Sequence, residues 1–252
     1  MNAICETLHS LRSIHGDFAA RRVPEDELTQ ILDVAIRAAN ASNRQSYSIV
    51  VVDDTETMKE LTGYVGSHAL VCCVDFTRLL DTAAHLGDEY AIRGLPEFLA
   101  GAVDTSLVVQ TVVVAAKSFG IDSLVTNGIH RGDPARVYRI LGLPEAHCFP
   151  LIAVILGYAE SEPAQRRGRL DGSAIIHRGR YHRATPAELA DIVAQYDDPD
   201  TNLALNVPWR ERGFSHYLNW FFQVWSRRAP ATAGRSQVAE ILDRCGFLET
   251  TD

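Results

Sequence analysis

Hydrophobic positions along the chain follow two different periods, which predict helices and strands in mixed order. After Pro24 and three consecutive carboxylates, apolar side chains recur at helical spacing as far as Ala39, which favours a helix that starts near Pro24. Four short runs that are β-branched or apolar predict buried strands: 48–53, 70–76, 123–126 and 149–158. The last of them is too apolar to leave one face in water.

A long apolar stretch in the middle of the chain predicts a helix at the centre of the molecule. We take Asp104 as its N-cap, Ser118 as its last residue and Gly120 as its C-terminal signal. Apolar side chains surround nearly its whole circumference, which is typical of a buried helix. The longest apolar run, 107–116, is well short of the roughly 20 residues that a membrane span needs, so we expect a core helix. A shorter helix is expected at 133–142, which begins with Asp-Pro and ends in Gly.

The pattern changes after Tyr158. Residues 159–184 are rich in Arg, Gly and polar groups and show no sustained period, which indicates an extended crossing segment. Helices resume at Thr185, which has capping-box spacing to Glu188. Two further helices are expected, at about 212–227 and 236–245, the first rich in aromatic residues. The chain therefore divides into a core, 1–158, and a crossing segment with a C-terminal helical extension of the same domain, 159–252.

Composition and charge exclude several classes of partner. The chain has 252 residues and a net charge of -8, with 32 acidic and 24 basic side chains. This balance argues against a general surface for nucleic acid or anionic membrane, because such surfaces gather many cations on one face. The five cysteines form no C-x-x-C pair, and most lie in apolar runs, as expected for reduced thiols. The N-terminal residues lack the pattern of a signal peptide, so we expect a cytoplasmic protein.

The common catalytic and metal-binding motifs are missing from the sequence. It contains no G-x-S-x-G, G-x-x-x-x-G-K-[ST] or H-E-x-x-H, and no G-x-G-x-x-G after a predicted strand. His177 and His182 are five residues apart, a spacing that does not place them on one helical face, and we predict no metal site. Adjacent Cys72 and Cys73 in a strand point to opposite faces, which indicates packing rather than redox chemistry. If the protein is an enzyme, a cofactor supplies its chemistry.

Three arginines gather within four positions of the crossing segment. Arg166, Arg167 and Arg169 stand in the stretch AQRRGRLDG of an otherwise acidic chain. Guanidinium groups at this density are typical of an anion site, because each can bind phosphate oxygens with two N–H groups. The alternative is a solvated loop, since the chain has only two lysines and uses arginine throughout. Both interpretations remain open on the residues alone.

Several segments, taken together and in order, resemble the FMN-dependent nitroreductase family. They are RSIHGDF at 12–18, AANASNRQSYSIVVVDD at 38–54, GAVDTSLVVQTVVVAAKSFGIDSLVTNGI at 101–129, LGLP at 141–144, and RGRL followed by IIHRGRY. The chain is most similar to the larger branch, which holds the oxygen-insensitive NADPH nitroreductases and the flavin reductases of luminous bacteria. The resemblance implies an α+β fold with a central, mostly antiparallel sheet flanked by helices and a C-terminal helical extension.

The resemblance also implies a set of residues that bind FMN. Positions that match the family's motif for the FMN phosphate and ribityl chain are Arg12, Ser13, Arg167 and Arg169. Positions that match its contacts to the flavin ring are His15, Asn43, Gln45 and Gly128, the last through its backbone N–H near flavin N5. Without the resemblance, Asn43 and Gln45 are equally typical of an ordinary turn, and Gly128 of a backbone with positive φ.

The chain departs from the family's pattern at several positions. His15 stands where Arg or Lys is usual, Val65 where a polar residue is frequent, and Asn40 where Pro-Ser or Ser-Ser is usual; Leu170 lacks the usual following Pro. The acidic segment DDPDTNLALNVPW, 197–209, replaces a basic segment that binds the 2′-phosphate of NADPH in the larger branch. This replacement puts a preference for NADPH in doubt, and Arg210 and Arg212 are the nearest remaining cations.

The resemblance implies an FMN-dependent oxidoreductase that takes a hydride from NADPH or NADH and passes electrons, in a ping-pong order, to a nitroaromatic, a quinone or a flavin. No side chain is expected to be catalytic, because flavin N5 carries the chemistry. The family's pattern implies a homodimer with FMN at the interface and a C-terminal extension that wraps the partner. Two alternatives remain: an FMN-dependent oxidase or dehydrogenase that tailors a biosynthetic intermediate, and a non-catalytic flavin-binding protein.

Overall fold

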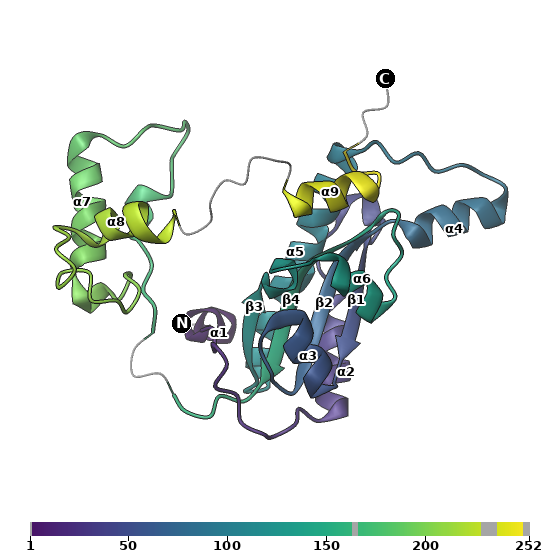
Figure 1. Cartoon of the computed structure of the whole chain (residues 1–252), viewed down its shortest axis with the longest axis horizontal. Helices are drawn as coiled ribbons and strands as arrows, with labels where there is room; N and C mark the ends of the chain where they lie inside the picture. Colours follow the sequence, from purple (N-terminus) through teal and green to yellow (C-terminus); the bar gives the residue numbers. More distant parts are fainter. Residues whose placement is uncertain (1, 163–165, 228–235, 249–252) are drawn as a thin grey trace. The chain divides into compact units, whose positions relative to one another are not determined.

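The computed structural model describes residues 2–162, 166–227 and 236–248. It consists of two compact units (Figure 1). The first comprises the chain as far as Ser161 together with its C-terminal end, and the second lies within 162–233. Each unit is described by itself.

A four-stranded antiparallel sheet is the centre of the first unit. Its strands are β1 (Tyr47–Val52), β2 (His68–Asp75), β3 (Asp122–Thr126) and β4 (Cys148–Gly157). They lie in the order β1-β2-β4-β3, so β1 and β3 are the edges. Every residue of β2 is buried, because it is central and covered on both faces. All four predicted strands are present with ends within two residues of those expected, and the α+β expectation is confirmed.

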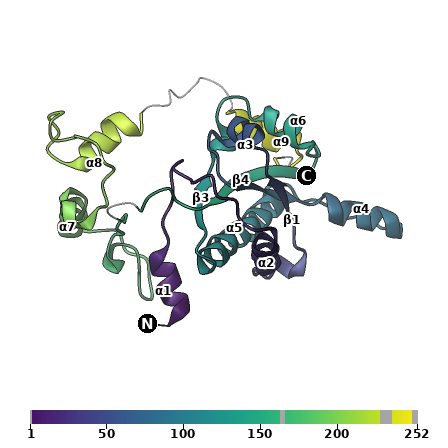
Figure 2. The same cartoon turned by 90° about the horizontal axis from the view of Figure 1, so that it is seen from below.

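Helices cover both faces of this sheet. The helices of the first unit are α1 (Ala3–Ser10), α2 (Glu25–Ala35), α3 (Thr55–Thr62), α4 (Thr77–Leu86), α5 (Leu95–Ser118), α6 (Ala135–Leu141) and α9 (Gln237–Arg244), with short 3₁₀ turns η1 (Ala41–Asn43) and η2 (Gly128–His130). Helices α2 and α5 pack on one face, and α3 and α6 on the other (Figure 2). Cys72 faces α2 and α5 whereas Cys73 faces α3 and α6, which confirms the prediction that the two thiols point to opposite faces.

The central helix α5 is longer than the sequence indicated. It begins at Leu95, with Gly94 as its N-cap, so Asp104 lies in its interior and the prediction that Asp104 caps it is wrong. Gly101 also lies inside the helix, where a Cβ would lie 2.6 Å from Val74 Cγ1, so this glycine lets the helix approach the sheet. Within the described ranges, α5 alone is long and apolar enough to cross a membrane. It packs instead against α2 and the sheet, as a core helix.

The second unit is smaller and mostly helical. It contains η3 (Gly172–Ala174), α7 (Pro186–Asp197), η4 (Pro199–Thr201), α8 (Tyr217–Trp220) and the π-helical turn η5 (Phe221–Trp225). The capping box of Thr185 and Glu188 is present, as predicted. The helix expected at 212–227 is shorter, because Gly213 takes φ 81° and separates a turn from α8. Trp209, Tyr217 and Trp220 form the buried core of this unit.

The C-terminal helix α9 belongs to the first unit. It begins after Ser236, whose side chain accepts a hydrogen bond from the N–H of Ala239, close to the predicted start. Ile241, Cys245 and Phe247 are buried, in a cluster that includes Phe76.

Candidate functional site

The segment that leads into β1 has an unusual backbone. Ser42, Asn43 and Gln45, three residues out of four, take left-handed φ values of 53°, 54° and 52°. A left-handed conformation costs an L-residue roughly 1–2 kcal/mol, less for Asn, so the segment stores a few kcal/mol of strain. The side chains of Asn43 and Gln45 are exposed. Strain of this kind persists only where surrounding contacts fix it, and it clusters at functional sites.

Contacts from distant parts of the first unit fix this segment, which we call the carboxamide loop (residues 40–46). Asp104 Oδ1 accepts a hydrogen bond from the N–H of Ala41 at 2.9 Å. Asp104 Oδ2 accepts one from Ser46 Oγ at 3.1 Å. Within the loop, Asn40 Oδ1 accepts from the N–H of Gln45 at 3.1 Å, and Arg78 donates to the carbonyl of Gln45. The exposed carboxamides are therefore presented on a rigid segment.

A cluster of charges surrounds the start of β3. Asp122 Oδ2 accepts a hydrogen bond from Arg12 Nη2 at 3.0 Å, and its Oδ1 lies 3.0 Å from Lys117 Nζ. The side chains of Arg12 and Asp122 are only 7% and 8% exposed, so water screens this pair weakly. Ser13 forms a bridge with Ser123 of β3. Arg12 and Lys117 thus share one carboxylate at this corner of the sheet.

The remaining predicted residues of the first unit are Ser13, His15 and Gly128, and their burial differs. Ser13 and His15 are exposed. Gly128 begins η2 and donates its N–H to Thr126 Oγ1 at 3.1 Å. A Cβ on Gly128 would lie 2.2 Å from the carbonyl oxygen of Thr62, so the backbone of α3 requires glycine here. This close approach, rather than a positive φ, is the structural reason for Gly128.

The predicted arginines of the crossing segment lie in the second unit. Arg167 donates to Asn202 Oδ1 at 3.2 Å and to the carbonyl of Ala204. Arg169 donates locally, to the carbonyls of Arg167 and Gly168, and both arginines are exposed. A Cβ on Gly168 would lie 1.9 Å from the carbonyl oxygen of Thr201, so the two chain segments are in close contact. The arginines thus lie on a backbone that η4 and the residues after it support.

The acidic segment that follows α7 uses its carboxylates locally. Asp197 accepts hydrogen bonds from the N–H of Tyr217 at 2.8 Å and pairs with His216 Nδ1 at 2.6 Å. Asp198 accepts from the N–H of Asp200 at 2.9 Å and so caps η4. These carboxylates orient the turn into α8.

The two groups of predicted residues in the first unit lie at opposite corners of the sheet. The carboxamide loop precedes β1, one edge strand, and the Arg12 cluster adjoins the start of β3, the other edge. Asp104 and Lys117, which mark the two groups on α5, are 13 residues apart, which is about 20 Å along a helix. Three strand spacings add about 14 Å across the sheet. The structure therefore does not bring Asn43 and Gln45 together with Arg12 and Ser13 within one chain.

The sequence analysis missed the residues that support the site. Asp104, Asp122, Lys117 and Arg78 are partners of the predicted residues, and none was named for that role. One signal was available, since a charged residue within an apolar helix is rarely buried unless it has hydrogen-bond partners. Asp104 is 2% exposed inside α5 and follows that rule.

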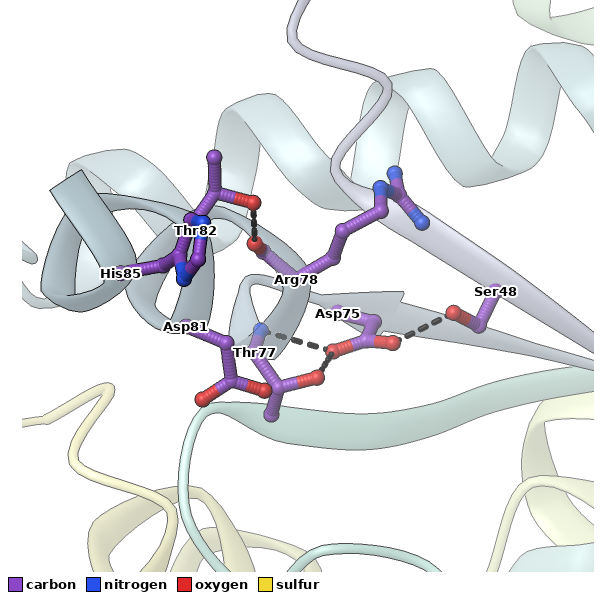
Figure 3. Close-up of a pocket in the computed structure, with 7 residues that line it drawn as sticks. All are labelled: Ser48, Asp75, Thr77, Arg78, Asp81, Thr82 and His85. Atoms are coloured by element: carbon purple, nitrogen blue, oxygen red, sulfur yellow. Dashed lines mark hydrogen bonds between the residues drawn. The ribbon is translucent and has the colours of Figure 1, made fainter.

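An open pocket of about 410 Å³ lies beside the carboxamide loop, between the end of β2 and α4 (Figure 3). It is lined by Ser48, Asp75, Thr77, Arg78, Asp81, Thr82 and His85. Asp75 accepts hydrogen bonds from Ser48 Oγ and from the N–H and Oγ of Thr77. Its carboxylate is therefore satisfied by β1 and by the start of α4.

Among the described residues, the buried cysteines and the paired histidines are engaged in packing and in local contacts. Burial raises the pKa of the Cys72 thiol to about 12, so this thiol stays protonated and inert. In the second unit, His177 Nδ1 and His182 Nδ1 are 3.1 Å apart, although their sequence spacing did not predict contact. Among the described residues, no group of three or more His, Cys, Asp or Glu side chains is placed to hold a metal ion.

The helix-covered antiparallel sheet with its C-terminal helical region defines an α+β protein of the nitroreductase-like fold. The model of the family described as "Nitroreductase family" matches residues 10–158, more than half of the chain. The chain belongs to the nitroreductase family, and as a member it is an oxidoreductase, which confirms the class that the resemblance implied.

Known relatives agree with this assignment. The chain is 30% identical to an NADPH-dependent oxidoreductase of Staphylococcus aureus (strain MRSA252), over 81% of this chain and 85% of the relative. It is 28% identical to an FMN reductase [NAD(P)H] of Bacillus subtilis (strain 168), over 79% and 81%. Among solved structures, that of B. megaterium NfrA2 superposes with a TM-score of 0.79 and 25% sequence identity. The match covers 98% of this chain and 99% of the NfrA2 chain.

Proposed function

We propose that this protein is an FMN-dependent NAD(P)H oxidoreductase that reduces nitroaromatics, quinones or flavins. The observation that carries the proposal is the carboxamide loop, in which a strained backbone held by tertiary contacts presents Asn43 and Gln45 to solvent. The match to the nitroreductase family and the names of the two relatives support FMN as cofactor and NAD(P)H as donor.

The donor set of the chain suits FMN. A phosphate needs cations and hydroxyls: the first unit offers Arg12 and Ser13, and the second unit offers Arg167 and Arg169. Asp122 orients the Arg12 guanidinium, and a guanidinium has five N–H donors, so one group can bind a carboxylate and a phosphate together. The edge of a neutral flavin ring needs donors and acceptors without charge, which the carboxamides of Asn43 and Gln45 provide. His15 would lie at the pyrimidine edge, and the backbone at Gly128 near N5.

When bound, FMN supplies the two-electron chemistry, accepting a hydride from the nicotinamide and passing electrons to a second substrate in a ping-pong order. The protein's own groups bind and orient the substrates. No side chain of the proposed site needs to act as a nucleophile. The rigid carboxamide loop keeps its hydrogen-bonding groups in place before the cofactor binds, which avoids an ordering cost on binding.

We further propose that the protein is a homodimer in which two copies share each FMN site. In one chain the carboxamide loop and the Arg12 cluster lie at opposite corners of the sheet, and a two-fold related copy can place one corner beside the other. A stripe of exposed apolar side chains along α5, Leu95, Leu99, Val103 and Leu107, supports such an interface, because large apolar side chains in a row mark association surfaces. We place the dimer in the cytoplasm, where its five free thiols remain reduced.

The core of the proposal is tested by FMN uptake and turnover. Purified protein should bind FMN with the absorbance of a flavoprotein and reduce menadione with NADH or NADPH. A protein that takes up no FMN would contradict the cofactor assignment. A flavin-loaded protein that does not oxidise NAD(P)H would instead favour the oxidase or the non-catalytic alternative.

The shared site is tested by complementation between two defective variants. Ser13→Asp puts a carboxylate against the phosphate and leaves the Arg12 pair intact, and Asn43→Ala/Gln45→Ala removes the ring contacts. Each homodimer should bind FMN at least tenfold more weakly, by about 1.4 kcal/mol. In a 1:1 co-expressed mixture, half of the dimers are mixed and one of their two sites is intact, so about a quarter of all sites should regain full affinity. No recovery would show that each site is built from one chain.

A further inference from the structure

Asp104 is a buried carboxylate in the interior of α5. It is 2% exposed, and both of its oxygens accept hydrogen bonds from the carboxamide loop. One bond comes from the N–H of Ala41 near the start of the loop, and the other from the hydroxyl of Ser46 at its end. The carboxylate therefore joins the two ends of the loop across the residues with left-handed φ.

Gly101 makes this reach possible. It lies one helical turn before Asp104, and a Cβ there would be 2.6 Å from Val74 Cγ1, 3.2 Å from Phe76 Cε2 and 3.4 Å from the carbonyl oxygen of Ser46. A side chain at this position would have to displace Val74 or move α5 from the sheet. The Gly101–Asp104 pair thus places a short, inflexible carboxylate directly beneath the loop.

The loop contains no glycine between residues 40 and 46, so its left-handed residues do not follow from local preference. Its shape needs contacts from outside. Arg78 and, within the loop itself, Asn40 hold the Gln45 backbone. Arg44, between the two carboxamides, donates to Tyr90 Oη at 3.0 Å and pairs with Glu97, but each of these contacts acts at a single loop residue. Asp104 is the residue that, within the described part of the chain, contacts both ends of the loop, and it thereby helps to set where the two carboxamides point.

We propose that Asp104 is a positioning residue for the flavin: it acts through the Ala41 N–H and the Ser46 hydroxyl to hold Asn43 and Gln45 in register with the ring edge. It sets FMN affinity and reduction potential without touching the cofactor. This inference rests on the proposed function, because it presumes that the carboxamides meet FMN.

The test compares Asp104→Ala with Asp104→Asn. The alanine variant loses both hydrogen bonds. The asparagine variant keeps an acceptor for the Ala41 N–H, and its NH₂ can donate to Ser46 Oγ, so it should restore the geometry without the charge. We expect the FMN Kd to rise at least tenfold in Asp104→Ala and to stay within about threefold of wild type in Asp104→Asn. Equal losses in both variants would overturn the hydrogen-bonding route.

A double-mutant cycle separates positioning from general loosening. Asp104→Ala is measured in the wild type and in the Asn43→Ala/Gln45→Ala background. If Asp104 acts through the carboxamides, its tenfold effect on the Kd should shrink to under about threefold in that background. An undiminished effect would overturn the proposal. Ser46→Ala, which removes one of the two hydrogen bonds, should give an intermediate Kd and provides the test if Asp104→Ala does not fold.

The reduction potential of bound FMN gives an independent measurement. Hydrogen-bond donors at the ring edge favour the more electron-rich reduced flavin, so misplaced carboxamides should lower the potential. A tenfold change in the ratio of the two Kd values, for oxidised and reduced FMN, corresponds to about 30 mV for a two-electron couple. The control is Asp54→Ala, which removes a carboxylate that caps α3 by accepting from the N–H of Thr57 at 2.7 Å and should not change the potential. Equal shifts in both variants would overturn the proposal.

Failure of this inference can be distinguished from failure of the proposed function. If wild-type protein binds no FMN, the proposed function fails first. If wild-type protein binds FMN and Asn43→Ala/Gln45→Ala weakens binding while Asp104→Ala does not, the proposed function stands and the positioning role of Asp104 is wrong.

Discussion

Replacing Asp122 by alanine tests the charge cluster that supports the proposed phosphate site. The variant removes the carboxylate that accepts from Arg12 Nη2 and from the N–H of Ala159, at 3.0 and 3.2 Å, and that pairs with Lys117 Nζ. Arg12 would then lose its bond to Asp122 in a position where its side chain is 7% exposed. An arginine cannot escape this cost by losing its proton.

The size of the effect follows from burial. Removing one partner of a buried ion pair costs about 3–5 kcal/mol, because the other charge stays desolvated. Lys117, which is 20% exposed, can turn toward water and adds little to this figure. For a protein of this size, each kcal/mol lowers the Tm by roughly 2–4 °C. Asp122→Ala should therefore lower the Tm by roughly 6–20 °C.

Thermal unfolding followed by circular dichroism measures the effect, and Asp133→Ala is the matched control. Asp133 pairs with Arg139 at 3.1 Å, as Asp122 does with Arg12, but the two side chains are 56% and 66% exposed. Solvent screening makes such pairs weak, so the control should lose much less stability. Equal decreases in Tm for the two variants would refute the argument from burial. In addition, 100 Kd of FMN should raise the stability of the wild type by about 2.7 kcal/mol, and that of Asp122→Ala by less at the same concentration, because Arg12 is no longer oriented.

Three further predictions concern the cofactor, the pH dependence of stability and the donor. Arg167→Ala/Arg169→Ala should raise the FMN Kd about a hundredfold or more, because a charge-assisted hydrogen bond contributes roughly 1.5–3 kcal/mol. Arg166→Ala is the control: this residue lies on the opposite side of an extended segment, so its loss should change the Kd less than about threefold. Equal Kd values for the two variants in titrations would contradict the phosphate assignment. Burial lowers the pKa of His68 below 6.5, so the unfolded chain binds this proton more readily and the free energy of unfolding should fall as the pH drops through that value. Urea unfolding of His68→Gln should show a flatter dependence of stability on pH. A pH profile equal to that of the wild type would refute the link between His68 and stability. The acidic segment 197–200 should keep the kcat/KM preference for NADPH over NADH below about a hundredfold, close to 2.7 kcal/mol. A larger preference in steady-state kinetics would show that another group of the protein binds the 2′-phosphate of NADPH.

Local patterns in the sequence determined most of the secondary structure. The central strands β2 and β4 are nearly continuous apolar runs, because both are covered on both faces. The Thr185–Glu188 capping box fixed the start of α7 because both of its hydrogen bonds are made within one turn. Where a local signal had two meanings, prediction failed. Gly101 and Asp104 are typical of a helix boundary, yet both lie inside α5, since one permits contact with the sheet and the other reaches a loop.

In the candidate site, too, some residues could be identified from the sequence and others only from the tertiary structure. The sequence alone named Arg12, Asn43 and Gln45, because motifs keep their residue types and order, but it could not supply their partners. Asp122 meets Arg12 across 110 residues of chain, and Asp104 meets Ala41 across 63. The left-handed backbone of the carboxamide loop likewise does not come from glycine, since the loop contains none. Only the tertiary structure decided these features, because their free energy comes from contacts that form once α5, β3 and the loop have packed together.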